Sequence, residues 1–207
     1  YPFKGLCGAG VAFKLCMGIN NELGNNLEDV LKYTDLVAIA TTADVVPIID
    51  ENRLIVKEGL KNIIEGNNTG IRALLKVSKL DTHNINIGKL GYWFIPKINA
   101  AGRLGDAARA VKLFTTNNSQ FANEIAIDLE NENEKRKLIT MQHENDAKRI
   151  INDSINLDQD KIIILYDDNW HFGVVGIVAS RIKDLYNRPT IVLTKEDGFY
   201  KGSCRSI

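Results

Sequence analysis

The sequence predicts an α/β chain of three successive parts. Residues 1–117 carry apolar side chains at helical spacing, interrupted by Gly and Asn, which predicts a largely helical part. Residues 118–157 predict one long linker helix, because residues 118–155 contain neither Gly nor Pro. Residues 158–207 show the order strand, helix, strand, strand, which is typical of a βαβ unit in a smaller α/β domain.

The largely helical part divides at its Gly and Asn residues. Apolar periodicity predicts helices over 8–23, 27–33, 70–79 and 106–115, and a further helix that Asp50, Glu51 and Asn52 cap and Gly66 ends. The apolar run over residues 35–49 fits a helix and a buried strand equally well. Residues 82–105, rich in Gly and Asn, are expected to be irregular.

The remaining elements follow from changes in residue pattern. The linker has apolar stripes near both ends, but its residues 130–137 are polar on every side, so we expect this stretch to be solvated. The smaller domain is expected to contain strands over 161–166, 190–194 and 200–206, with a helix over 173–187.

Composition restricts the class of protein. No apolar run approaches the roughly 20 residues needed to span a bilayer, and three Cys without paired spacing favour a cytoplasmic protein over a disulfide or zinc framework. Lys and Arg together number 26, and so do Asp and Glu, so the net charge is zero. A nucleic-acid binder, by contrast, usually has a positive net charge. Nucleic-acid binding therefore requires either a locally basic face or positive charge on parts of the protein outside this chain. The chain lacks an initiator Met and stops inside a motif, so we expect an internal piece of a longer protein.

Asp44 is a lone acid inside an apolar stretch. An unpaired buried carboxylate is costly, and Mg²⁺ or Mn²⁺ is a natural partner for its oxygens. The alternative interpretation is a cap or turn residue before Pro47. His83 and His143 lie far from other ligand types and are expected at the surface.

Two further segments combine small residues with groups that suit phosphate. Around residues 98–106, small side chains permit close backbone approach, Asn99 carries an amide, Arg103 a planar fork, and Asp106 is expected to cap the next helix. Near the end of the chain, Ser203, Arg205 and Ser206 make a possible phosphate cradle. The alternatives are a glycine loop with a structural Arg and an exposed edge strand.

Trp170 and His171 stand where a strand gives way to a helix. An aromatic ring there could stack on a base and an imidazole could contact a phosphate, whereas the alternative for Trp170 is an ordinary core residue.

Taken in order, these segments resemble the RecJ family, the single-strand-specific DNA exonucleases of the DHH phosphoesterase superfamily. The resemblance rests on residues 43–47, 51–53, 96–105, 170–181 and 202–206. It implies the C-terminal part of a DHH phosphoesterase domain (1–117), a linker helix (118–157) and the first part of a DHH-associated α/β domain (158–207). It also implies 5′-to-3′ degradation of single-stranded DNA with Mn²⁺ or Mg²⁺, in DNA repair and recombination.

The resemblance implies a role for each candidate residue. Asp44 matches one metal ligand of the catalytic site, and the family's other metal motifs have no counterpart in this sequence, so we expect the isolated chain to be inactive. Arg103, Ser203 and Arg205 are expected to hold DNA phosphates, with Asn99, His171 and Ser206 as further DNA contacts. Lys97 stands where Arg is common in the family.

Two other functions stay open from the sequence. One is a DHH-type phosphodiesterase acting on short oligonucleotides or cyclic dinucleotides, and the other is a non-catalytic nucleic-acid-binding module. Single-stranded DNA is the expected partner, a helicase or single-strand-binding protein is a possible one, and no membrane association is expected.

Overall fold

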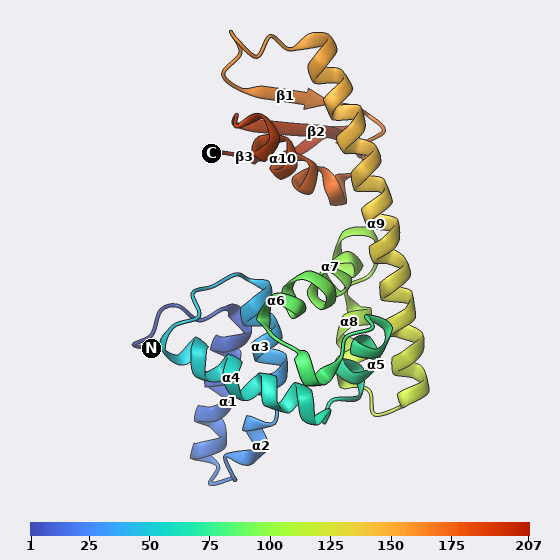
Figure 1. The fold of residues 1–207 in the computed structure, drawn as a ribbon. Helices are drawn as coiled ribbons and strands as arrows, with labels where there is room; N and C mark the ends of the chain where they lie inside the picture. Colours follow the sequence, from blue (N-terminus) through green and yellow to red (C-terminus); the bar gives the residue numbers. More distant parts are fainter. The chain divides into compact units, whose positions relative to one another are not determined.

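The computed structural model describes residues 1–207, apart from the side chain of His83. The chain forms two compact units (Figure 1). The helical unit comprises residues 1–102 and 106–130, and the α/β unit comprises residues 103–105 and 131–207. No helix in the described part of the chain is long and apolar enough to cross a membrane.

The helical unit follows most of the expected boundaries. The helices are α1 Gly8–Glu22, α2 Glu28–Leu31, α3 Thr34–Ala43, α4 Asp50–Glu65, α5 Thr69–Val77 and α8 Ala108–Thr115. The ambiguous run over residues 35–49 is therefore mostly helix α3. Gly66 ends α4 with a φ of 73°, as expected for a left-handed cap. The capping expectation was wrong in detail, since Ile49 is the N-cap of α4 and makes no side-chain capping bond.

The expectation of irregular structure over residues 82–105 is wrong. This stretch forms a 3-10 turn η1 (Thr82–Asn84), α6 (Ile87–Lys89), a π-helix η2 (Leu90–Phe94) and α7 (Ile95–Leu104). Leu90, Phe94 and Ala101 are all fully buried. Because the π-turn inserts an extra residue, the apolar spacing shifts from the regular helical period and is hard to recognise in the sequence.

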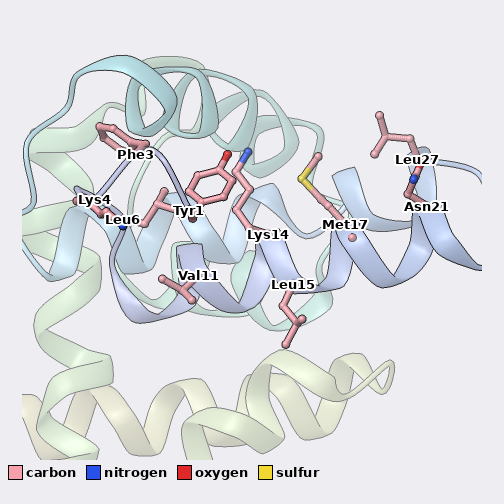
Figure 2. A pocket seen from close by; sticks show the side chains of 11 residues that line it. Tyr1, Phe3, Lys4, Leu6, Val11, Lys14, Leu15, Met17, Asn21 and Leu27 are labelled. Atoms are coloured by element: carbon pink, nitrogen blue, oxygen red, sulfur yellow. The ribbon is translucent and has the colours of Figure 1, made fainter.

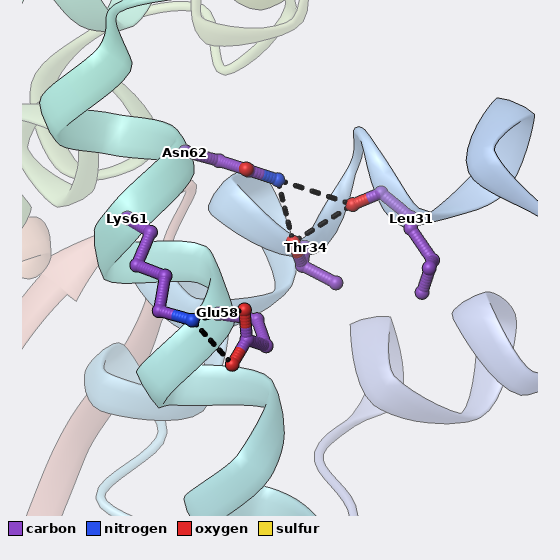
Figure 3. Close-up of polar contacts among 5 residues, drawn as sticks. All are labelled: Leu31, Thr34, Glu58, Lys61 and Asn62. Atoms are coloured by element: carbon purple, nitrogen blue, oxygen red, sulfur yellow. Dashed lines mark hydrogen bonds and ion pairs between the residues drawn. The ribbon is translucent and has the colours of Figure 1, made fainter.

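Polar side chains join the short helices of the helical unit. The Asn62 amide of α4 donates to the Thr34 hydroxyl at 2.8 Å and to the Leu31 carbonyl at 3.2 Å (Figure 3). The Thr34 hydroxyl in turn donates to the same carbonyl at 2.8 Å. These bonds satisfy a carbonyl group at the end of α2, where helices leave such groups without a helical partner.

The long helix α9 (Ser119–Ser154) contributes to both units. Its Ala122, Ala126 and Leu129 lie in the core of the helical unit, and Ala147 and Ile151 lie in that of the α/β unit. The polar middle of α9 is not solvated on every side, contrary to expectation, because the side chain of Asn133 is buried there.

The α/β unit contains β1 (Ile163–Tyr166), α10 (Phe172–Tyr186), β2 (Thr190–Glu196) and β3 (Phe199–Arg205). β1 and β2 are parallel, which confirms the βαβ prediction, and β3 lies antiparallel to β2. The sheet order is β1-β2-β3. Apolar residues of β1, β2, α10 and the end of α9 form the core, which includes Trp170.

Candidate nucleic-acid interface

Strand β3 directs two candidate side chains toward α10. Ser203 and Arg205 are two residues apart and therefore share one face of the strand. A Cβ built on Gly176 of α10 would lie 3.3 Å from Ser203 Oγ and 3.2 Å from Arg205 Nη2. Arg205 Nε also donates to Ser180 Oγ at 3.0 Å. The hydroxyl and the guanidinium are thus held together beside the same glycine.

His171 caps the N-terminus of α10. Its Nδ1 accepts a hydrogen bond from the Gly173 backbone N at 3.0 Å. An Nδ1 that accepts must be unprotonated, so the neutral ring carries its proton on Nε2. The side chain is exposed. His171 therefore presents an N–H donor at the positive end of a helix, where an anion is stabilised.

Arg103 is held against the first turn of α10. Its Nη1 donates to the Gly173 carbonyl at 3.1 Å. A Cβ on Gly173 would lie only 2.1 Å from the Arg103 backbone oxygen. Only glycine at position 173 therefore lets the backbone of Arg103 come this close to α10. This contact places the Arg103 guanidinium beside the same helix end as His171.

Side chains of α9 and β2 bind the backbone of the two residues that precede α10. His143 Nε2 accepts from the His171 backbone N at 2.9 Å, and Thr194 Oγ1 donates to the Trp170 carbonyl at 2.6 Å. Trp170 is a core residue, as the alternative interpretation of this position predicted.

His143 corrects a sequence expectation. It was expected at the surface, but it is 7% exposed, and burial is the main cause that lowers its pKa. The side chain of His83 lies outside the described residues. His143, Ala147 and Ile151 are four residues apart and therefore lie on one face of α9. This apolar spacing was the signal in the sequence that could have revealed the burial of His143.

The zero net charge conceals local positive charge. In the described part of the chain, no carboxylate lies within ion-pair distance of Arg103 or Arg205, and both residues are exposed. Together with His171 and the N-terminus of α10 they form what we call the α10 anion surface: Arg103, His171, Ser203 and Arg205. Its donors suit a phosphate diester.

Two other predicted contact residues have different surroundings. Ser206 follows β3, and its hydroxyl donates to the Ile207 carbonyl at 3.4 Å. Asn99 belongs to the helical unit and is exposed on α7. The small residues beside it serve a different purpose from the one expected, since Ala100 and Ala101 are completely buried in α7 and do not line a loop. Lys97 is also buried there and pairs with Glu130.

Asp106 was expected to cap α8, but the N-cap is Ala107, and Asp106 bonds to the helix from one residue before it. Its Oδ1 accepts from the Ala108 backbone N at 2.8 Å, at the first residue of α8. The carboxylate thereby satisfies one of the free backbone donors of that helix.

Asp44 lies at the C-terminal end of α3 and is exposed, so the premise that it is buried was wrong. The buried acid of this stretch is Asp35, which is 2% exposed and whose pKa burial raises. Asp44 is followed by Val45, whose φ of 55° is unfavourable for a β-branched residue. A carboxylate at a helix C-terminus is also electrostatically unfavourable. Both features cost stability, and local strain of this kind is concentrated at functional sites.

The metal expected from the resemblance can be tested against the ligands that this chain carries. Carboxylate oxygen suits Mg²⁺ and Mn²⁺, so Asp44 fits one coordination position. Among the described residues, however, no three or more His, Cys, Asp or Glu gather in a group that could hold a metal ion. This chain by itself does not fit a two-metal centre.

A large hollow in the helical unit does not fit a phosphate. It has a volume of about 840 Å³, lies along α1, and is lined mostly by apolar side chains, among them Leu6, Val11 and Leu15 (Figure 2). None of the candidate residues lines it. A mostly apolar wall disfavours an anion.

The comparisons with known proteins concern the family and the fold. Residues 159–207, which include α10 and β3, match the DHHA1 domain model. The single-stranded-DNA-specific exonuclease RecJ of Bacillus subtilis is 40% identical over 100% of this chain, and that of Dickeya dadantii is 38% identical over 100%. The chain spans 26% and 38% of the length of these two relatives.

Solved structures give the same result for the fold. Crystal structures of RecJ from Thermus thermophilus, in complex with Mg²⁺ and with Mn²⁺, each match with a TM-score of 0.86 at 32% identity. Each match covers 100% of this chain, and 31% and 30% of the respective solved chain.

Proposed function

We propose that this chain, which is homologous along its whole length to part of the RecJ proteins, forms the strand-holding part of a single-stranded-DNA-specific 5′-to-3′ exonuclease. The observation that carries the proposal is the α10 anion surface. Donors from three separate segments lie beside α10, with Arg103 and His171 at its N-terminus and Arg205 next to Ser180.

The donors on this surface suit the sugar-phosphate backbone of a strand. Arg103 and Arg205 each present a planar fork that can bind phosphate oxygens in bidentate fashion. The Ser203 hydroxyl and the His171 Nε2–H can add single hydrogen bonds. Because these groups recognise phosphate and not base edges, they support hydrolysis of strands of any sequence.

We further propose that Asp44 supplies one ligand to a divalent metal, Mn²⁺ or Mg²⁺. The exposed carboxylate and the strained Val45 beside it support this role. When bound, the metal would act as a Lewis acid in phosphodiester hydrolysis. Its other ligands would come from outside this chain, which is why we expect the chain alone to be inactive.

We also propose a cellular role for the whole protein. It would act in DNA repair and recombination in the cytoplasm, with a helicase or a single-strand-binding protein presenting its substrate. The names of the reported relatives favour single-stranded DNA over short oligonucleotides or cyclic dinucleotides. A substrate panel containing all three separates these possibilities.

The direct test is Mn²⁺-dependent degradation of 5′-labelled single-stranded DNA. The full-length protein, its Asp44→Ala variant and the 207-residue chain are assayed side by side. We expect activity only in the unaltered full-length protein. Full activity in Asp44→Ala removes Asp44 from the metal site, and a full-length protein that binds strands without cleaving them favours a binding module.

A further inference from the structure

Phe172 is an exposed aromatic residue beside the α10 anion surface. It directly follows His171 and is the first residue of α10. Its side chain is 43% exposed, whereas Trp170, on the other side of His171, is 4% exposed. The stacking role that the sequence allowed for Trp170 is therefore not available to that residue. Of these two apolar rings, only that of Phe172 is open to solvent.

Phe172 lies on the face of α10 that runs along β3. Phe172, Gly176 and Ser180 are four residues apart and therefore share one face of the helix. Gly176 lies beside Ser203 and Arg205, and Ser180 Oγ accepts a hydrogen bond from Arg205 Nε at 3.0 Å. Phe172 is thus about 6 Å along the helix axis from the glycine that faces these donors.

A contact with Lys201 connects the Phe172 ring to β3. Lys201 Nζ lies 5.9 Å from the centroid of the ring, which is within the range of a cation–π interaction. The same ammonium is paired with Glu196 at 2.8 Å. Lys201 shares its face of the strand with Ser203 and Arg205, since the three alternate along β3. The order along both elements is therefore the same: first the ring, then the hydroxyl and the guanidinium.

An exposed ring in line with these donors suits a nucleotide better than an isolated anion. Proteins that bind single strands combine positively charged groups, which follow the backbone, with aromatic side chains on which bases stack. The Phe172 ring offers no hydrogen bond to a phosphate, but its apolar face can pack on the flat face of a base.

We propose that Phe172 stacks on one base of the single strand while the α10 anion surface holds adjoining phosphates. This role rests on the proposed function and adds a preference for unpaired bases to it. Bases inside a duplex are stacked on one another, so only an unpaired base can meet the ring. Because every base has a π-face, the contact selects single strands without selecting a sequence.

Removal of the bases from the strand tests this role. Affinity of the full-length protein is measured in EDTA for fluorescently labelled oligo-dT and for a strand of equal length that lacks all its bases. We expect Phe172→Ala to lower affinity for oligo-dT about 10-fold and to leave affinity for the abasic strand unchanged. The slope of log affinity against log salt should stay the same, since the ring neutralises no phosphate.

Three further variants make the result specific. Phe172→Tyr keeps an aromatic ring, so we expect wild-type affinity for both strands. Phe172→Leu keeps an apolar side chain without the ring, so we expect the same loss on oligo-dT as in Phe172→Ala. Phe121→Ala is the matched control, because Phe121 is 42% exposed and belongs to the helical unit, and we expect no change on either strand.

The outcomes distinguish the stacking role from a structural role and from the proposed function. Equal losses of affinity for both strands in Phe172→Ala indicate a structural role of the ring and overturn stacking. Unchanged affinity for oligo-dT in Phe172→Ala or in Phe172→Leu overturns it as well. Absence of oligo-dT binding by the unaltered protein overturns the proposed function instead.

Discussion

The two units hold their candidate residues in different ways. In the α/β unit, Arg103, His171 and Arg205 each make a hydrogen bond to α10 or its cap. In the helical unit, the side chains of Asp44 and Asn99 are exposed and have no hydrogen-bonding partner within the described residues. The difference indicates that this chain preorganises the groups that we propose hold a strand, whereas the group that we propose binds metal needs further ligands from elsewhere.

The largest expected effect concerns Asp44. Asp44→Asn removes the charge of the carboxylate, and we expect exonuclease activity of the full-length protein to fall more than about 100-fold, since even outer partners of metal ligands contribute about 10–100-fold. Single-strand affinity in EDTA should not change. A variant that loses strand binding together with activity contradicts the separation of roles between the two units.

Gly173→Ala should damage the α10 anion surface. The new Cβ would meet the Arg103 backbone oxygen at 2.1 Å, so the contact must open. We expect a loss of about 1–3 kcal/mol in the free energy of unfolding, measured by chemical denaturation, together with weaker strand binding. Gly176→Ala is the matched control, because its Cβ would meet only side-chain atoms of Ser203 and Arg205, at 3.2 Å or more. Equal stability losses in both variants contradict this account.

Arg205→Gln should weaken strand binding alone. Hydrogen bonds to charged groups contribute about 1.5–3 kcal/mol, which corresponds to about 10-fold or more in affinity. Fluorescence anisotropy with labelled oligo-dT measures the change. Cys204→Ala, on the opposite face of β3, is the control and should bind as the wild type does. Unchanged affinity in Arg205→Gln removes this residue from the surface.

The smallest expected effect is a pH dependence of stability. The pKa of His143 is lowered in the folded chain, so the unfolded chain binds its proton first as the pH falls. Neutral His143 therefore makes its full contribution to the free energy of unfolding above the ordinary His pKa of about 6.5. This contribution is lost as the pH falls toward the pKa of His143 in the folded chain. Denaturation curves at several pH values should show this loss, with a shallower dependence in His143→Leu. An identical pH dependence in the variant contradicts it.

Local signals in the sequence predicted most elements of the fold. The Gly-free and Pro-free run predicted α9, and the alternation of strand and helix patterns predicted the parallel β1–β2 pair. The helices over residues 82–104 were missed for two reasons. A π-turn shifts their apolar spacing, and the small residues Ala100 and Ala101 were interpreted as part of a loop, whereas they are buried in the packed helix α7.

The candidate site was predicted less completely. Residue chemistry identified Arg103, His171, Ser203 and Arg205, but their convergence on α10 depends on contacts between distant segments that no local pattern contains. The burial of Asp35 in place of Asp44 depends on tertiary packing in the same way.

One binding measurement tests the division of labour most directly. Affinity for 5′-labelled single-stranded DNA is measured in EDTA for the full-length protein, an Arg103→Gln/Arg205→Gln double variant and Asp44→Asn. We predict that the double variant loses about 100-fold or more in affinity, from two charged contacts, while Asp44→Asn binds as the wild type does. An unchanged double variant, or an Asp44→Asn protein that binds as weakly as we expect of the double variant, contradicts the assignment of strand holding to the α10 anion surface.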